Sequence, residues 1–348
     1  MSMEKALLLP DEGKRLFFDR ARIRHPRINE VLADFESMAA LNTGTDLILL
    51  TGPTGVGKST LITRIWEMIM EKYQQKINED PGYIPAVIIS APASGEAVFS
   101  WRMFYTRIGD ALAEPLIDRK QSTFLVGDRV ITSRSSRGCT VAALQTAISG
   151  CLLARRTSLL VIDEAIPLVR NARGDSLETH MDALRSLSNI CGLTLAIVGS
   201  YDLLRLVELS GQLARRSTIL HFPRYQTGVK ADENAFQSAL ASLQRYIPLK
   251  NVPDLTLRSD QLHNACIGCV GILKDTLARA LEISLHLGGR WSDENLRKAL
   301  LPKKSLLSIL RETLEGEKQI KDLAFGSATF NDYADIQNFL QEERTCNR

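Results

Sequence analysis

Long apolar runs are missing from this 348-residue chain. No segment approaches the roughly 18 uninterrupted apolar residues that a membrane-spanning helix needs. The apolar run near the N-terminus is too short for a signal peptide, and acidic residues follow it closely. Aromatic residues make up only 6% of the chain and charged residues 24%, which is ordinary for a globular protein. These features predict a cytoplasmic protein with no membrane partner.

Cysteine is sparse and the charges nearly balance. Six cysteines are scattered along the chain, which in a cytosolic protein predicts buried thiols. His263, Cys266 and Cys269 recur at three-residue spacing, which hints at a metal site. A structural zinc site needs four ligands, however, and no second Cys/His pair lies nearby. The formal charge of +3 permits nucleic-acid binding without requiring it.

Glycine is concentrated in "TGPTGVGKST", Thr51 to Thr60, between an apolar run and an amphipathic stretch. Its spacing is the P-loop pattern, in which backbone N–H groups and a helix N-terminus surround phosphates. A plain glycine-rich turn is the alternative, but the full pattern between a strand and a helix favours the phosphate site. Lys58 would reach the β- and γ-phosphates of ATP, and Ser59 would ligate Mg²⁺. The residues expected to contact ATP are Gly52, Pro53, Thr54, Gly55, Val56, Gly57, Lys58, Ser59 and Thr60.

A second motif, "TSLLVIDEA", supplies groups for hydrolysis. Four apolar residues, Leu159 to Ile162, read as a buried strand that ends in Asp163 and Glu164. Asp163 would hold the magnesium ion's water shell, and Glu164 would polarise the attacking water. The alternative is an acidic N-cap for the next segment.

The acidic pair narrows the class of P-loop protein. The Asn-Lys-x-Asp motif that reads guanine in GTPases is absent. RecA-type and AAA+ ATPases carry such an acidic pair. The next strand, "LTLAIVGS", ends at Ser200, which could reach between Glu164 and the γ-phosphate as the polar residue called sensor one. A simple turn at the strand end explains Ser200 equally well.

Two further basic features suit an AAA+ protein. Arg215 and Arg216 precede a strand, and one of them could act as an arginine finger on a neighbouring subunit's nucleotide. Cations at a helix end, favoured by the helix dipole, are the alternative. In "GCVGILKDTLARA", Lys274 or Arg279 matches the place of sensor two in the lid, with Lys274 the weaker match to the usual arginine.

The motifs together resemble an AAA+ ATPase of the TniB/TnsC transposition-regulator family. The resemblance runs from about residue 20 to 285 and rests on "RIRHPRINEVLADFESM", the P-loop, "LLVIDEA", "LTLAIVGS" and "QLARRSTILHFPRY". It implies ATP-dependent binding to double-stranded DNA and assembly into rings or filaments. It also implies contacts with a transposase and target-selector proteins. The chain lacks the long extra domains of the largest members.

An AAA+ P-loop domain with a mostly parallel five-stranded sheet, followed by a small all-helical lid, is the expected α/β architecture. Apolar runs alternate with helical stretches from about 46 to 222, and strand signals nearly vanish from 226 to 320. The expected units are an N-terminal helical segment that contacts the nucleotide base, an ATPase core, a lid and a tail. Their ranges are 1–40, 41–225, 226–320 and 321–348.

The resemblance also places "IRHPR" near the adenine. Ile23 and Pro26 suit a hydrophobic wall, and His25 or Arg27 could touch the base or ribose. A capped helix start is the alternative.

The stretch from Arg119 to Arg137 is the predicted DNA contact. It holds five cations against one acid, and "TSRSSRG" can donate to phosphates through side chains and backbone. The candidates are Lys120, Arg129, Arg134 and Arg137, and a solvated surface loop is the alternative.

Two other functions compete with transposition regulation. An AAA+ protein of the initiator or clamp-loader type in DNA replication or repair shares the ATPase motifs but usually appends a winged helix, for which only 293–310 is a thin candidate. A protein remodeller would need an aromatic pore loop, and Ser100 to Tyr105 reads better as a helix face.

Overall fold

The computed structural model describes residues 3–40, 47–93, 95, 98–114, 123–126, 129–132, 140–170, 176–207 and 217–323. Its main sheet has five strands in the order β2-β5-β6-β1-β7, and every neighbouring pair is parallel. The predicted fold class is confirmed. The strands are β1 (Leu47–Thr51), β2 (Ala86–Ser90), β5 (Leu159–Asp163), β6 (Thr194–Gly199) and β7 (Ser217–His221).

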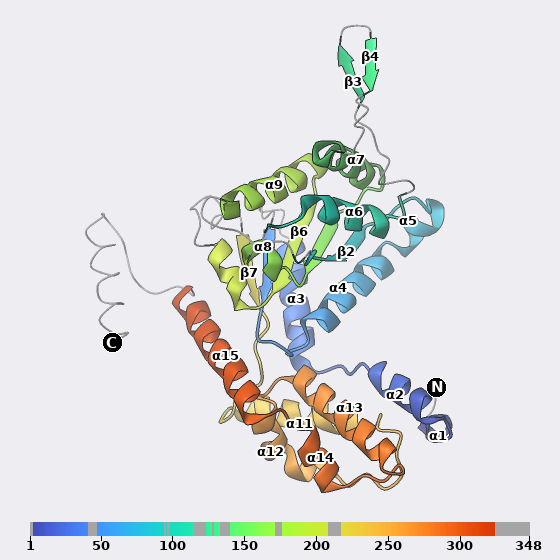
Figure 1. The fold of residues 1–348 in the computed structure, drawn as a ribbon, viewed down its shortest axis with the longest axis vertical. Coiled ribbons are helices and arrows are strands. Elements are labelled where there is room, and N and C mark those ends of the chain that lie inside the picture. Colours follow the sequence, from blue (N-terminus) through green and yellow to red (C-terminus); the bar gives the residue numbers. More distant parts are fainter. Residues whose placement is uncertain are drawn as a thin grey trace, which may run out of the picture.

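Helices cover both faces of this sheet (Figure 1). Alternate residues of β1 point to opposite faces, as the two-residue period of a strand requires. Ile48 and Leu50 join one buried cluster, while Leu47 and Leu49 join the other. The first face packs against α3 (Pro26–Ala40) and α4 (Lys58–Lys72). The second packs against α6 (Trp101–Ala111), α7 (Val141–Ala154) and α9 (Ser176–Cys191).

Short elements connect this core. They are α5 (Gln74–Glu79), α8 (Ile166–Arg170) and the 3₁₀ helix η2 (Tyr201–Leu206). In α6, the Ser100 hydroxyl accepts a hydrogen bond from the Met103 N–H, and Phe104 and Tyr105 are buried. The expectation that Ser100 to Tyr105 forms a helix face is confirmed, because two of its aromatic rings are packed in the core and cannot grip a substrate.

The lower part of Figure 1 is helical. It contains α11 (Lys230–Gln244), η3 (Leu255–Arg258), α12 (Ser259–Ala265), α13 (Val270–His286) and α14 (Asp293–Ala299). Two N-terminal helices, α1 (Met3–Leu7) and α2 (Asp11–Asp19), lie beside it, and α2 contacts α13. We keep the word lid for residues 226–299.

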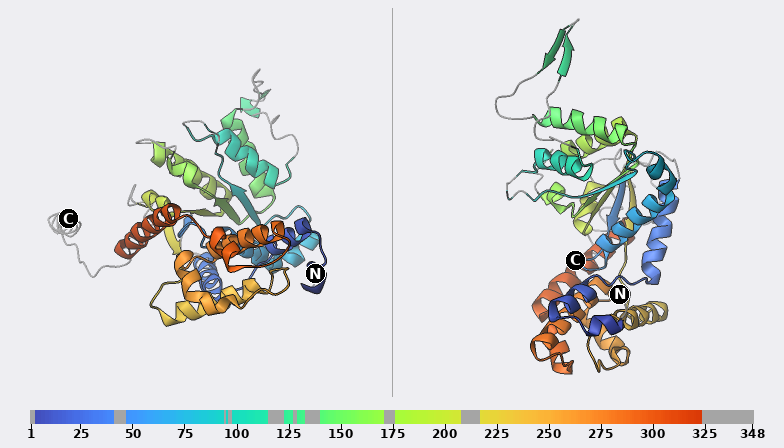
Figure 2. Two further views of the ribbon diagram at one scale, coloured as in Figure 1. Left: turned by 60° about the horizontal axis from the view of Figure 1, so that its bottom comes forward. Right: turned by 90° about the vertical axis from the view of Figure 1, so that its right-hand side faces the viewer.

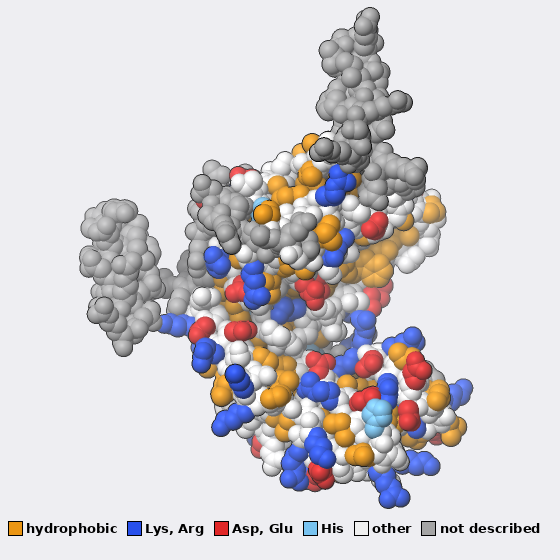
Figure 3. Space-filling model, viewed as in Figure 1, with side chains coloured by type: hydrophobic (Ala, Val, Ile, Leu, Met, Phe, Trp, Pro, Cys, Tyr) orange, Lys and Arg blue, Asp and Glu red, His pale blue; other side chains and the backbone are white. Residues whose placement is uncertain are grey.

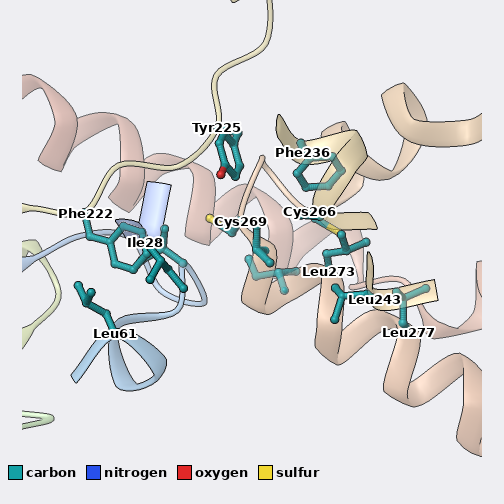
Figure 4. Close-up of a cluster of buried hydrophobic side chains, with 14 of the residues drawn as sticks. Ile28, Leu61, Phe222, Tyr225, Phe236, Leu243, Cys266, Cys269, Leu273 and Leu277 are labelled. Carbon is teal, nitrogen blue, oxygen red and sulfur yellow. The ribbon is translucent and has the colours of Figure 1, made fainter. Parts of the chain in front are cut away.

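Apolar packing continues from the core into the lid. Figure 4 shows core residues facing lid residues across Cys269. All belong to one buried cluster, so the domain boundary predicted near 225 stays a prediction. The residues labelled there are Ile28, Leu61, Phe222, Tyr225, Phe236, Leu243, Cys266, Cys269, Leu273 and Leu277.

The helix α15 (Lys303–Leu323) follows α14 and runs from the lid back toward the core, as the views in Figures 1 and 2 agree. It contacts η2 at the end of β6. Within the described residues no strand follows α14, so 293–310 form two helices there and not a winged helix.

A separate two-stranded antiparallel sheet lies within the predicted DNA-contact segment. It pairs β3 (Thr123–Val126) with β4 (Arg129–Thr132). In the part of the chain that the structure describes, no helix is long and apolar enough to cross a bilayer.

Candidate nucleotide-binding site

The glycine-rich loop connects β1 to α4 at the carboxyl edge of the sheet. Gly55 and Gly57 have φ values of +75° and +115°, a region that side chains disfavour. Gly52 allows a close approach to the backbone that follows β7, because a Cβ there would lie 2.4 Å from the Phe222 carbonyl oxygen. The local sequence therefore meets two backbone demands of a phosphate-binding loop, left-handed turns and tight packing.

Lys58 is the first residue of α4, and its ammonium folds back onto the loop. It donates to the carbonyl oxygens of Gly52 at 2.8 Å and Pro53 at 2.9 Å. Burial lowers the pKa of Lys58 to about 8, although the nearby Cys269 and Asp163 oppose that shift. Phosphates would take over the role of these carbonyls and favour the charged amine.

Nucleotide affinity should therefore fall as the pH rises above about 8, the pKa of free Lys58. Binding to phosphates then requires uptake of a proton, so affinity should drop about tenfold per pH unit. The free energy of unfolding of the nucleotide-free protein should instead rise with pH over this range. Above about 8 the unfolded lysine, with its ordinary pKa of 10.5, binds more protons than the folded one.

A titration of ATP affinity from pH 7 to 9.5 measures this dependence. A Lys58→Arg variant is the control, because a guanidinium stays charged over that range. A flat profile for the natural protein would contradict the role assigned to the Lys58 amine.

The acidic pair sits beside the loop, at the end of β5. The Ser59 hydroxyl donates to Asp163 Oδ2 at 3.0 Å, and the Glu164 N–H donates to Asp163 Oδ1 at 2.8 Å. Glu164 is exposed and has a left-handed φ of +52°, which is strained for a residue with a side chain. The oxygens of Ser59 and Asp163 are hard ligands that suit Mg²⁺, and Glu164 is free to meet a water molecule.

Ser200 lies directly after β6, which separates β5 from β1 in the sheet. Its hydroxyl makes no capping hydrogen bond with η2. A cavity of about 260 Å³ brings Ser200 together with Pro53 and Thr54 of the loop. Two arginines that sequence analysis missed, Arg170 and Arg205, also line this cavity. The P-loop, the acidic pair and Ser200 thus converge because the strands that carry them are parallel and adjacent.

A second cavity, of about 310 Å³, lies between α4 and the segment of residues 22–32. Ile23, Ile28 and Leu32 provide apolar walls, and Thr60 and Asn29 provide polar groups. Four charged side chains complete the lining. Ile23 is among the lining residues, and its contact with the nucleotide base stays a prediction.

His25 has a different role from the expected contact with the base. It is buried, and its Nδ1 lies 2.9 Å from the Tyr225 hydroxyl. Burial lowers the pKa of His25 to about 4, so it is neutral at physiological pH. Neither His25 nor Pro26, the first residue of α3, lines the cavity around Ile23.

Arg27 ties the N-terminal segment to the lid, a function that sequence analysis did not assign. Its guanidinium pairs with Asp232 of α11 at 2.7 Å and with Glu30 at 2.8 Å. It also lies over the Tyr225 ring, 5.4 Å from the centroid. These contacts join α3, the segment that follows β7, and the lid.

The lid touches the phosphate loop through the start of α13. The Ile272 N–H donates to the Gly55 carbonyl at 3.1 Å, and a Cβ on Gly271 would lie 2.3 Å from that oxygen. Lys274 points elsewhere: its ammonium donates to the Asp19 carbonyl at 2.7 Å. Arg279 donates to the Ala299 carbonyl inside the lid. The structure therefore brings neither candidate for sensor two to the loop, because both side chains are bonded to partners away from it.

The Cys/His trio belongs to the lid core. Cys266 and Cys269 are free thiols in the buried cluster, and His263 Nδ1 lies 3.2 Å from the Thr227 hydroxyl. Among the described residues, no group of three or more His, Cys, Asp or Glu side chains is arranged to hold a metal ion.

Several predicted residues lie outside the described part of the chain. Arg129 begins β4, but its side chain is not described. The residues outside the description are Arg215, Arg216, Lys120, Arg134 and Arg137.

Comparison with known proteins supports the fold deduced from this geometry. Residues 41–207 match a family model described as an AAA domain. The fold is similar to that of the Aeropyrum pernix ORC2 protein in ADPNP–ADP complexes, with 17% identity, a TM-score of 0.56 and coverage of 81% of this chain and 70% of that one. It is also similar to the Aeropyrum pernix ORC1 protein in complex with DNA, with 18% identity, a TM-score of 0.54 and coverage of 90% and 83%.

No curated protein matches the chain. The comparisons show an AAA domain and do not show the transposition-regulator family that the sequence resembles. The chain has the AAA+ P-loop fold.

Proposed function

We propose that this protein is an AAA+ ATPase that binds DNA and acts as an ATP-dependent switch of the replication-initiator type. The observation that carries the proposal is the convergence of the P-loop, Asp163, Glu164 and Ser200 at one edge of the sheet. The similarity to an ORC1 protein in complex with DNA favours the initiator type over transposition regulation.

Each residue of the site has a distinct task in hydrolysis. Lys58 binds and orients the β- and γ-phosphates, and Ser59 with Asp163 would hold Mg²⁺, which offsets phosphate charge when bound. Glu164 orients the attacking water and accepts its proton. Ser200 would donate toward the γ-phosphate. An arginine from a neighbouring subunit, Arg215 or Arg216, would stabilise the charge that develops in the transition state.

The finger hypothesis predicts complementation between two inactive variants. An alanine variant of the correct arginine should bind ATP normally yet hydrolyse it slowly. Mixing it with Lys58→Ala protein should restore part of the activity, since each subunit supplies what the other lacks. ATPase assays over a range of mixing ratios, with the exposed lid substitution Arg297→Ala as control, measure this. No rescue at any ratio would argue for a site complete within one chain.

DNA binding is proposed for the segment that contains the β3–β4 hairpin. On the face shown in Figure 3, acidic and basic side chains are interspersed over the described surface, so no single-sign field marks another DNA site there. The cations of this patch are Lys120, Arg129, Arg134 and Arg137. Contacts between cations and backbone phosphates do not depend on the base sequence of the DNA. Repetition of this patch in an oligomer would strengthen binding to a duplex.

Alanine at both Arg134 and Arg137 should weaken DNA binding about equally on unrelated duplexes. It should also flatten the salt dependence by roughly one unit of log–log slope per lost contact. Filter binding at several salt concentrations on two duplexes measures both effects. The matched control is Arg290→Ala with Arg297→Ala, which removes the same charge from the exposed lid surface. Unchanged affinity and slope in the patch variant would mean that the segment is only a solvated loop.

Regulation of transposition is the second candidate. The described residues after α14 form one helix that returns to the core, and not the winged helix that an initiator usually appends. The partners would then be a transposase and target-selector proteins. Adjacency of the gene to a transposase gene, and imaging of rings or filaments on DNA with a non-hydrolysable ATP analogue, would separate the two candidates.

A further inference from the structure

The helix α15 docks on the core through a glycine. Gly316 packs flat against the ring of Tyr201, the first residue of η2, and a Cβ at this position would lie 2.0 Å from the ring's Cγ. Glycine inside a helix costs about 1 kcal/mol relative to alanine. The contact explains why a 21-residue helix contains one, since any side chain would prevent docking.

An ion pair fixes the same end of α15. Arg224, in the segment after β7, donates from Nε and Nη2 to the two carboxylate oxygens of Glu317 at 2.8 and 3.1 Å. The side chains are only 13% and 11% exposed. A two-pronged geometry of this kind is directional, so it specifies where α15 sits.

The docked helix forms one wall of the cavity that holds Ser200. Glu312, Glu315 and Gln319 of α15 face the same space as Pro53 and Thr54 of the phosphate loop. This is the γ-phosphate end of the loop, because the Lys58 ammonium, which would hold the β- and γ-phosphates, lies against the Pro53 carbonyl.

The charges in this cavity decide how α15 and a nucleotide would interact. Arg170 and Arg205 are its cations, and Asp202 already pairs with Arg170 at 3.3 Å. Glu312 and Glu315 add two carboxylates when α15 is docked. These two carboxylates would repel the charge of a γ-phosphate in the same cavity. ADP brings no γ-phosphate and avoids this conflict.

We propose that α15 is a latch over the γ-phosphate side of the site, that its docked position disfavours ATP relative to ADP, and that bound ATP releases it. The proposal rests on the nucleotide site proposed above. Since coupling between two equilibria is reciprocal, anything that undocks α15 must strengthen ATP binding, and ATP must loosen α15 by the same factor.

Gly316→Ala tests the docking step. The added Cβ blocks the contact with Tyr201, while alanine favours the helix itself, so α15 should remain helical and undock. Hydrogen exchange over residues 303–323 should rise without nucleotide, and ATP affinity should rise about fivefold or more with ADP affinity unchanged. Adding Tyr201→Ala, which removes the clashing ring, should restore docking. Leu314→Ala, exposed on the same helix, is the matched control and should change neither measurement.

Glu312→Gln with Glu315→Gln tests the charge without touching the Gly316 contact. ATP affinity should again rise about fivefold, since two charges that repel the γ-phosphate are removed, and ADP affinity should stay constant. In the natural protein, a non-hydrolysable ATP analogue should raise exchange over 303–323, and ADP should not.

The outcomes separate the latch from the nucleotide site. If neither ATP nor ADP binds the natural protein, the proposed function fails. If both bind, but ATP affinity is unchanged in the two variants, the latch is overturned while the nucleotide site stands. The latch would also be overturned if hydrogen exchange over residues 303–323 did not change on addition of the ATP analogue.

Discussion

Lys58→Ala is expected to abolish nucleotide binding, whereas Glu164→Gln should preserve binding and lose hydrolysis by about 10²-fold or more. The Lys58 ammonium lies against the loop carbonyls at the place where phosphates would sit, so its loss removes ground-state affinity. Glu164 is exposed at the end of β5, and its hydrogen bond to Asp163 comes from the backbone N–H, which the substitution keeps. Glutamine keeps the shape of the side chain but cannot accept a proton.

Equilibrium binding of a fluorescent ATP analogue and a steady-state ATPase assay distinguish the two losses. Glu178→Gln, on an acid in the first turn of α9, is a matched control that should leave both measurements unchanged. Hydrolysis at the natural rate by the Glu164 variant would show that another group activates the water.

Gly271→Ala should lower nucleotide affinity about tenfold or more, because it disturbs the lid at the phosphate loop. A Cβ there would meet the Gly55 carbonyl oxygen at 2.3 Å and its carbon at 3.0 Å. Both are backbone atoms of the loop, so they cannot rotate away as a side chain would. The loop or the start of α13 must shift, and the Ile272 hydrogen bond to Gly55 must lengthen.

Gly150→Ala is the control for the same chemical change. Gly150 lies within α7, and a Cβ there would meet no atom within 4 Å. This variant should be neutral for nucleotide binding and more stable by about 0.5–1 kcal/mol, the usual gain from alanine in a helix. Thermal unfolding and nucleotide titration of both variants measure the contrast. Natural affinity in the Gly271 variant would mean that the lid contact is irrelevant to the nucleotide.

Local pattern was sufficient for the parts of the site that are continuous in sequence. The spacing from Gly52 to Ser59 predicted the loop, and the apolar run before Asp163 predicted a strand that ends in acids. The structure brings the Ser59 hydroxyl within 3.0 Å of Asp163 because parallel strands end at one edge of the sheet. The alternation of apolar runs with helical stretches was enough to predict a parallel sheet.

Contacts between distant segments were beyond the sequence. The sequence analysis placed His25 and Lys274 at the nucleotide. In the structure His25 bonds to Tyr225 and Lys274 bonds to Asp19, which are 200 and 255 positions away along the chain. A side chain that can bond to many groups takes the partner that the packing offers. Nothing in the local sequence specifies that partner.

The sequence by itself therefore determined the AAA+ class of fold, the phosphate loop and the acidic pair, since each follows from residues close along the chain. Only the tertiary structure decided that Gly271 meets Gly55, and that Gly316 seats α15 against Tyr201. The reason is physical. Helical and strand periods encode what a segment forms, whereas a glycine required by close packing is identified only when the opposing atoms are in place.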